Sequence, residues 1–441
     1  MHKISNLVVL FILISAIALI LYFSQGTKQN DIIVTANGNP GMIYIYKFDG
    51  GNFVRTEINT GYNLVWTVRI GDIYNKGKNV IVAGIGNSFF AQPFGCSIVT
   101  YEPTANGWKK DVIDSNVDIR CKEVEICDAY NDGKNEIVLG THGEGLIKIY
   151  KWNGTKWNSQ IIDENYVAKF DSQAGMNHKI PLENLTYYVT DQTAVHILKI
   201  GDIDNDGKNE IIATISTPNE YGGSDPEIGF VRMYKWNGTA WMTTDIDTLY
   251  GVKFRAGIQI DDLKGTGKNQ AYVTSAPHLL LEYDLQNGKW IRNVIENQTL
   301  SAEIDMKAMD IRDIGSKKEL IIATGGPNAV IYSYEWNGKG FDKNLIVNVS
   351  DILSETNLFG LGDNSMAVKT SNFNNTQYIV VSGESDTSST NSFANTSNPF
   401  GWEITPYGFL VASKYDGSKW NSEILDRYSV LGMTFGKLQI S

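Results

Sequence analysis

Short runs in which hydrophobic and polar residues alternate follow one another along almost the whole chain. This alternation is typical of β-strands that have one face on a core. A representative unit has four such strands, near residues 195–200, 210–214, 228–236 and 240–247. Asn-Gly or Asp-Gly dipeptides between the third and fourth strands favour type I′ hairpin turns, since both central residues of that turn need a positive φ. Helical periodicity is confined to the N-terminus, so the pattern predicts an all-β protein.

Two sequence motifs recur in these units. The first, GDIDNDGKNEIIAT, links the first and second strands, and the second, YKWNGTAW, spans the turn between the third and fourth strands. Four strands repeated at intervals of about 50–75 residues predict a β-propeller. We number the units as blades 1 to 6 by their copies of the first motif, which begin at residues 71, 127, 201, 261, 312 and 371.

The two ends of the chain are complementary. Residues 30–38 have the pattern of a second strand without its first, and residues 431–441 have that of a first strand without its second. Pairing these two segments in one blade would close the ring and cover two open sheet edges. We therefore expect residues 28–441 to form a seven-bladed β-propeller with four strands per blade, closed by its N- and C-terminal strands.

The repeats resemble the FG-GAP/VCBS family, the propeller repeats of integrin α-chains and of many exported microbial proteins. The resemblance is carried by GDIDNDGKNEIIAT and its partial copies, and it extends over residues 30–441. It implies a propeller fold and a calcium-binding loop. It does not select a function, because family members include adhesins, lectins and some polysaccharide lyases.

The loop of blade 3 has the spacing of a calcium site. Asp202, Asp204, Asp206 and Glu210 place carboxylates at positions 1, 3, 5 and 9 of the loop, and the Lys208 carbonyl lies at position 7. Ca²⁺ takes six to eight oxygen ligands, and the glycine at position 6 allows the tight turn. Because clustered carboxylates repel one another, we expect a structural calcium ion here and strain in the empty loop.

The other copies of the loop are weaker candidates. Blade 2 keeps Asp128, Asp132 and Glu136 as a weaker second site, but Tyr130 replaces one carboxylate and crowds the loop. Blades 1 and 4 have Lys76 and Lys264 at ligand positions. A lysine ammonium there would take the electrostatic role of the metal, so we expect no ion in either blade.

Polar residues on the predicted innermost strands form a further pattern. They lie three residues before the first position of each loop. Equivalent positions on neighbouring inner strands are close together, so we expect a belt in which Arg69, Glu125 and Lys199 pair across blades. The full set is Arg69, Glu125, Lys199, Gln259, Asp310 and Lys369.

The N-terminus contains an apolar run of 17 residues, 7–23, that follows Lys3. This length lies between the core of a signal peptide, about 7–15 residues, and a spanning helix of about 20. We expect residues 1–27 to form a hydrophobic signal-anchor helix in the cell membrane, with the propeller outside, because the lysine stays inside. The alternative is a signal peptide that is cleaved near Ser24-Gln25-Gly26, which would release a secreted protein.

The net charge limits the kinds of partner that can be expected, and the cysteine content limits the possible disulfides. The net charge is −11 without a basic stretch, which argues against a nucleic-acid partner, and no nucleotide-binding motif is present. Of the three cysteines, Cys96 and Cys121 both lie where a strand leaves the same face in adjoining blades, so a disulfide is expected between them. Cys127 is expected to be a buried free thiol.

Strand parity divides the loops between the two faces of the propeller. The short turns share one face, and the long loops, residues 87–95, 163–193, 216–227, 351–363 and 384–407, share the other. Long loops on one rim of a rigid scaffold are a usual place for binding. The aromatic candidates for ligand contact on these loops are Phe89, Phe90, Phe94, Tyr221, Trp402 and Tyr407.

These features predict an exported, membrane-tethered binding or adhesion propeller that recognises a cell-surface glycan or protein through its long-loop face. We expect no enzymatic activity, because no histidine lies in the spacing of a catalytic triad or a metal site. Two alternatives stay open: a polysaccharide lyase or hydrolase that uses the same face, and an assembly scaffold of the cell envelope.

Overall fold

The computed structural model describes most of the predicted propeller. The described residues are 30–49, 51–86, 95–164, 170–171, 176–177, 193–217, 228–250, 257–275, 279–297, 305–314, 317–326, 329–354, 363–373, 376–385, 407–428 and 430–438. The predicted signal-anchor segment, residues 1–27, lies outside these ranges. Among the described residues, no helix has the length and hydrophobicity needed to cross a membrane.

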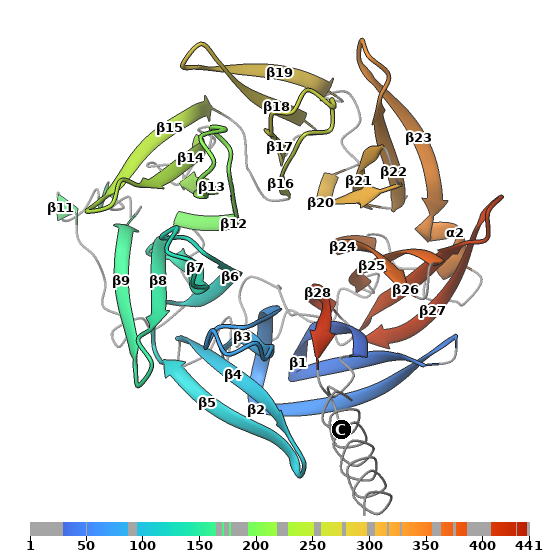
Figure 1. Ribbon diagram of the computed structural model, residues 1–441. Helices are drawn as coiled ribbons and strands as arrows, with labels where there is room; N and C mark the ends of the chain where they lie inside the picture. The colour runs from blue at the N-terminus through green and yellow to red at the C-terminus, as the bar shows by residue number, and fades with distance from the viewer. Residues whose placement is uncertain are drawn as a thin grey trace, which may run out of the picture.

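Antiparallel strands form sheets that stand around a common centre (Figure 1). The strands of blade 1 are β2 (Asn52–Gly71), β3 (Val80–Gly86), β4 (Cys96–Thr104) and β5 (Gly107–Asp114). Those of blade 2 are β6 (Arg120–Cys127), β7 (Glu136–Gly143), β8 (Leu146–Trp152) and β9 (Trp157–Glu164). Those of blade 3 are β12 (Thr193–Gly201), β13 (Glu210–Thr217), β14 (Ile228–Trp236) and β15 (Trp241–Tyr250).

The same order continues through the second half of the chain. Blade 4 contains β16 (Ile258–Asp261), β17 (Gln270–Ser275), β18 (Leu279–Gln286) and β19 (Lys289–Asn297). Blade 5 contains β20 (Asp305–Asp313), β21 (Lys318–Gly326), β22 (Val330–Trp336) and β23 (Phe341–Asn348), followed by a short helix, α2 (Val349–Ser354). Blade 6 contains β24 (Asp363–Phe373), β25 (Thr376–Ser385), β26 (Tyr407–Tyr415) and β27 (Trp420–Tyr428). A separate two-stranded ribbon consists of β10 (Phe170–Asp171) and β11 (Met176–Asn177).

The two ends of the chain pair with each other, as the sequence predicts. The last strand, β28 (Val430–Leu438), pairs antiparallel with the first part of β1 (Asn30–Asp49), from Asn30↔Leu438 to Asn37↔Val430. The second part of β1 pairs with β2, which continues into blade 1. This pairing covers one edge of each terminal strand and leaves β28 as the end strand of its six-stranded sheet. The all-β prediction is confirmed as well.

The hydrophobic core lies between neighbouring blades. One cluster joins Val82 and Ile98 of blade 1 to Val124 and Leu139 of blade 2, and all four side chains are fully buried. The sheets approach closely: a Cβ added at Gly140 would lie 2.6 Å from Cγ1 of Val195 in the next blade. Glycine at this position thus allows the inner strand of blade 3 to pack directly on the backbone of blade 2.

Asparagines of the first motif connect neighbouring blades through a set of hydrogen bonds that we call the asparagine clasp. Asn131 of blade 2 donates to the Asn209 carbonyl of blade 3 at 3.0 Å and accepts the Asn209 N–H at 2.7 Å. The Asn209 side chain donates back to the Asp128 carbonyl at 2.9 Å. The same contacts join Asn75 to Asn135 and Asn205 to Asn269, and partial versions join Asn79 to Lys437 and Gln377 to Asp313.

The innermost strands form the expected polar belt. Arg69 and Lys199 both donate to Oε1 of Glu125, the former at 3.1 Å, so the predicted triplet is confirmed. Farther round the ring, Gln259 donates to Asp310 at 3.3 Å, and the Lys369 ammonium lies 3.5 Å from Asp310. Glu123, which the sequence analysis omitted, also accepts from Arg69. Burial raises the pKa of Glu123 and lowers that of Lys369.

A disulfide joins Cys96 of β4 to Cys121 of β6, with a Cα–Cα distance of 5.6 Å, as predicted. It therefore links blade 1 to blade 2. Cys127 is free, but it is only half-buried, which corrects the expectation of a buried thiol. Its Sγ lies 3.6 Å from the Asn209 amide, and burial raises the pKa of Cys127 to about 11, so it is a thiol at neutral pH.

Removing one clasp should lower the free energy of unfolding. We expect Asn205→Gly to cost about 1–3 kcal/mol, because two hydrogen bonds to Asn269 are lost and the Asn269 N–H is left without its partner. Glycine tolerates the positive φ of 62° at this position, so backbone strain does not contribute. Denaturant unfolding measures the change. Asn287→Gly, at a φ of 51° in the hairpin turn of blade 4, is the control and should cost nothing; equal losses in both variants would contradict the clasp.

Removing the disulfide should also destabilise the protein. For a loop closed over 25 residues, the chain-entropy model predicts a loss of about 3–4 kcal/mol when Cys96 and Cys121 are both replaced by serine. Thermal unfolding of this double variant should match that of the reduced wild type. Cys127→Ser is the control and should change stability little. A wild type whose unfolding does not respond to dithiothreitol would refute the prediction.

Candidate functional site

The long-loop candidates are mostly outside the described structure. Phe89, Phe90, Phe94, Tyr221 and Trp402 all lie in ranges that the structure does not describe. Tyr407 is the first residue of β26, where it pairs with Tyr428 of β27. The candidate sites among the described residues lie on the opposite face, which carries the short turns.

The acidic loop of blade 3 brings three of its five predicted ligands together. Asp202, Asp204 and Glu210 each place one carboxylate oxygen within 4.8 Å of the others. Asp202 also accepts the N–H groups of Asp206 and Gly207, both at 3.0 Å, which closes the turn. The N–H of Lys208 donates to Asp206 at 3.0 Å. Glu210 is fully buried, and burial raises its pKa to about 7, aided by the Asp204 charge.

A lysine that the sequence analysis did not consider occupies this cluster. The ammonium of Lys235, from β14 of the same blade, contacts Asp204 and lies 2.7 Å from Asp206 and 3.2 Å from Glu210. Burial lowers the pKa of Lys235, but the hydrogen bonds that its ammonium donates to these carboxylates outweigh this effect and raise the pKa above its usual range. The signal for this contact was the lysine in YKWNGTAW, the motif interleaved with the acidic loops.

Blade 2 repeats the arrangement with one fewer carboxylate. Lys151, at the position equivalent to Lys235, lies 2.5 Å from Asp132 and 2.9 Å from Glu136. Asp128 accepts the N–H groups of Asp132 and Gly133 and so closes the same turn. Lys151 thus pairs with two of the three residues predicted for the weaker site, Asp132 and Glu136.

The hydrogen-bonded turn of these loops forms whether or not the loop has its full set of carboxylates. In blade 1, Asp72 accepts the N–H groups of Lys76 and Gly77 at 2.9 and 2.5 Å. Blade 4 repeats this with Asp262, Thr266 and Gly267. Loops without the calcium ligand set therefore have the same backbone hydrogen bonds, and the expected strain of an empty acidic loop has no support in the turn geometry. Lys264 pairs with Glu282, whereas Lys76 is exposed and makes no ion pair with any described residue.

The third loop position has a second role, because its side chain covers the aromatic hairpin of the next blade. The Tyr130 ring of blade 2 packs on Trp236 and Trp241 of blade 3, with centroid distances of 5.0 and 5.3 Å. Tyr74 packs in the same way on Trp152 and Trp157. In blade 4, the Lys264 ammonium lies 5.0 Å from the Trp336 ring, and in blade 6, Phe373 at the neighbouring position covers Phe48 and Phe53.

In blade 5 the loop is shorter, and the cation over the next hairpin is Arg312, which lies 5.1 Å from the Trp420 ring of blade 6. Gly201 pairs with Glu210 across an eight-residue loop in blade 3, whereas Arg312 pairs with Glu319 across a six-residue loop in blade 5. The hairpin that this shorter loop faces carries Tyr415 and Trp420 of blade 6, whose rings lie 5.2 Å apart. Tyr415 is 37% exposed, and Trp420 is partly accessible, as are Trp152 and Trp236 in the equivalent hairpins.

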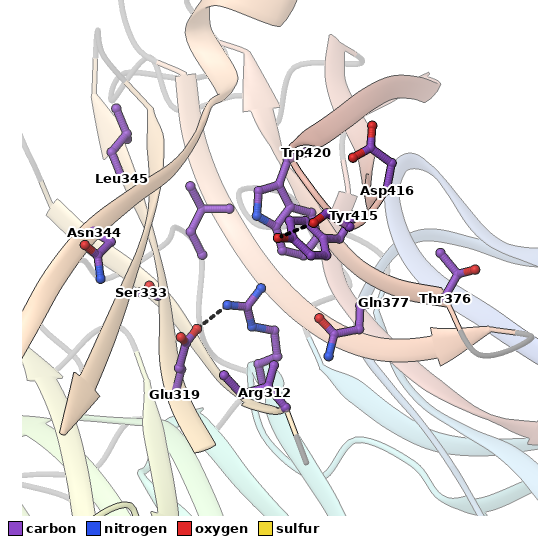
Figure 2. Close-up of a pocket in the computed structure, with 13 residues that line it drawn as sticks. Arg312, Glu319, Ser333, Asn344, Leu345, Thr376, Gln377, Tyr415, Asp416 and Trp420 are labelled. Carbon is purple, nitrogen blue, oxygen red and sulfur yellow. Dashed lines mark hydrogen bonds and ion pairs between the residues drawn. The ribbon is translucent and has the colours of Figure 1, made fainter. Parts of the chain in front are cut away.

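The result is a groove between blades 5 and 6, with a volume of about 880 Å³ (Figure 2). One wall is formed by Tyr415 and Trp420, and the other by β23 through Asn344 and Leu345. At its base, Arg312 pairs with Glu319 and lies 5.1 Å from the Trp420 ring. Nε of Arg312 is buried and makes no hydrogen bond to a described residue. The groove thus combines an exposed ring, a guanidinium and a carboxylate.

Comparisons with known proteins support the fold alone. No protein-family model matches the chain, and no curated protein sequence matches it. A solved protein of Bacteroides fragilis, provisionally assigned as a 6-phosphogluconolactonase, is similar with a TM-score of 0.53 and 11% identity, over 93% of this chain and 99% of that one. The six-bladed Aleuria aurantia lectin, described with its fucose recognition, is similar at a TM-score of 0.41 and 11% identity, over 83% of this chain and 94% of the lectin. The first of these two likenesses supports the fold.

Proposed function

We propose that this protein is an exported, membrane-tethered propeller of seven blades that binds carbohydrate of a cell surface in the groove between blades 5 and 6. The paired chain ends support the closed ring, and the apolar N-terminal run supports a membrane anchor with the propeller outside. The Cys96–Cys121 disulfide supports export, because disulfides persist in oxidising compartments. The repeat motifs support membership of the FG-GAP/VCBS family.

The exposed Tyr415 ring and the adjacent Trp420, beside Arg312 and Glu319, are the observation that carries this function. One face of a pyranose ring is made of C–H groups and packs on an aromatic ring, while its hydroxyls need both donors and acceptors. Arg312 supplies planar N–H donors, and the carboxylate of Glu319 accepts. The amides of Asn344 and Gln377 at the rim can do both. A groove of this size fits one or a few sugar units and suits a glycan better than the flat surface of a protein.

The same groove favours binding over catalysis. Glycoside hydrolysis needs two carboxyl groups across the scissile bond, one of them with a raised pKa. Glu319 is held by Arg312, and Asp416 accepts from the backbone and side chain of its own turn, which lowers its pKa below the usual range. Asp416 therefore stays ionised at neutral pH and cannot serve as the general acid. We therefore propose a binding protein rather than an enzyme.

Calcium is proposed as a structural ion of blade 3, bound by Asp202, Asp204, Asp206, the Lys208 carbonyl and Glu210. The donor set fits a cation, because Oδ1 of Asp204 is a buried oxygen without a hydrogen bond and the buried Oε1 of Glu210 already faces a cation, the Lys235 ammonium at 3.2 Å. The ion would neutralise the clustered carboxylates and so stabilise the loop. Blade 2, with Asp128, Asp132 and Glu136, would bind more weakly.

Mutation of the groove should abolish glycan binding. A glycan array with the purified propeller, followed by calorimetry on the best glycan, gives the reference affinity. We expect Tyr415→Ala to weaken it at least about tenfold, because the exposed ring is lost without loss of core packing, and Arg312→Met to do the same. Arg232→Met, which removes an arginine paired with Asp245 in blade 3, should leave the affinity unchanged. Binding that survives both groove variants would place the ligand elsewhere, and an array without binding would reject the carbohydrate assignment.

A further inference from the structure

We propose that the Lys235 ammonium is the resident cation of the blade 3 acidic loop and that calcium enters the loop only by displacing it. This inference rests on the calcium part of the proposed function and not on the groove. It makes Lys235 an internal competitor that sets the calcium affinity of the protein.

The position of the ammonium supports a direct competition. It contacts Asp204, Asp206 and Glu210, three of the four carboxylates that a calcium ion would need. The Lys235 side chain is 26% exposed, while Glu210 is fully buried, so the lysine reaches into the cluster from its rim. Two cations cannot share these oxygens at such distances without strong repulsion. The lysine must therefore leave before a metal ion can be coordinated.

Neutralisation by the chain's own cations recurs in the other blades. The buried glutamate at the ninth position meets Lys151 in blade 2, and the glutamate at the equivalent place in blade 5 meets Arg312. Blade 4 has Gln270 at the ninth position, and there Lys264 on the loop pairs with the buried Glu282 of β18. The element that supplies the cation differs, but each of these blades contains a buried carboxylate paired with a cation. Lys235 follows this rule in the blade that has the most carboxylates.

The exchange has a predictable direction. The lysine is part of the chain, so its ammonium is always available to the site. Calcium binds only the fraction of molecules in which the lysine has moved out, and the apparent dissociation constant is the intrinsic constant divided by that fraction. The divalent ion gains more from the clustered carboxylates than the ammonium does, which makes displacement possible at high calcium. Because the backbone turn has the same hydrogen bonds in blades 1 and 4, the loop stays folded in both states.

Calcium titration of the intact propeller by calorimetry tests this exchange. We expect Lys235→Met to lower the apparent dissociation constant at least about tenfold relative to wild type. In the variant, millimolar calcium should raise the melting temperature clearly, whereas in wild type the rise should be small. The added substitution Asp204→Asn should abolish the gain, because it removes a ligand from the unmasked site. Lys148→Met is the control: it also removes a lysine–carboxylate pair, with Asp114, and should leave calcium affinity at the wild-type value.

Each outcome decides one part of the proposal. Equal calcium affinity in wild type and Lys235→Met would overturn the exchange while calcium binding itself would stand. Absence of binding in both proteins would overturn the calcium assignment and the exchange together, and glycan binding in the groove would be unaffected. If Lys235→Met does not fold, Lys235→Arg replaces it. The guanidinium keeps the charge and adds donors, so calcium affinity should fall below wild type, and an affinity above wild type would refute the competition.

Discussion

The asparagine clasp is the contact on which the arrangement of these blades depends. Apolar packing between two sheets is not directional, so by itself it leaves neighbouring blades free to slide or tilt. The clasp adds hydrogen bonds of fixed geometry at one edge, as between Asn131 and Asn209. It requires the first asparagine to adopt a positive φ, which asparagine tolerates better than most residues. The conspicuous asparagines of the repeat therefore hold the blades in register rather than bind a ligand.

The clasp also determines what the neighbouring loop position can reach. Tyr74 and Tyr130 each directly precede a clasp asparagine, and Lys264 precedes Gly265, which takes the same left-handed conformation. Because the clasp holds this point of the loop against the next blade, the preceding side chain is placed on the aromatic hairpin there. A tyrosine or a lysine covers the rings. When the loop is two residues shorter, as in blade 5, Arg312 lies over Trp420 instead, and the Tyr415 ring stays exposed beside the groove.

Features that follow from strand spacing could be predicted from the sequence. The pairing of Asn30 with Leu438, the Cys96–Cys121 disulfide and the Arg69–Glu125–Lys199 belt all depend on which face of a strand a residue occupies, and parity determines that. The contact of Lys235 with the acidic loop could not be predicted in this way, because it depends on the reach of a long side chain across a blade. The groove was missed for another reason. The groove depends on a loop in blade 5 that is two residues shorter than the loop of blade 3. The short motif RDIGSKKEL was the one sign of it in the sequence.

Glu210 and Glu319 illustrate how one position in the repeat can lead to two different chemistries. Each pairs with the residue that directly precedes the first aspartate of its loop, Gly201 and Arg312 respectively, and each has less than a tenth of its side chain exposed. In blade 3, the partner residue is glycine, which has no side chain to pair with Glu210. The carboxylate pairs instead with Lys235 from the third strand, and the full-length loop encloses this ion pair. In blade 5, arginine at that position pairs with the carboxylate and packs against Trp420, and the shortened loop leaves both accessible from the groove. The partner residue and the loop length, rather than the glutamate, thus separate an internal ion pair from a surface that can bind a ligand.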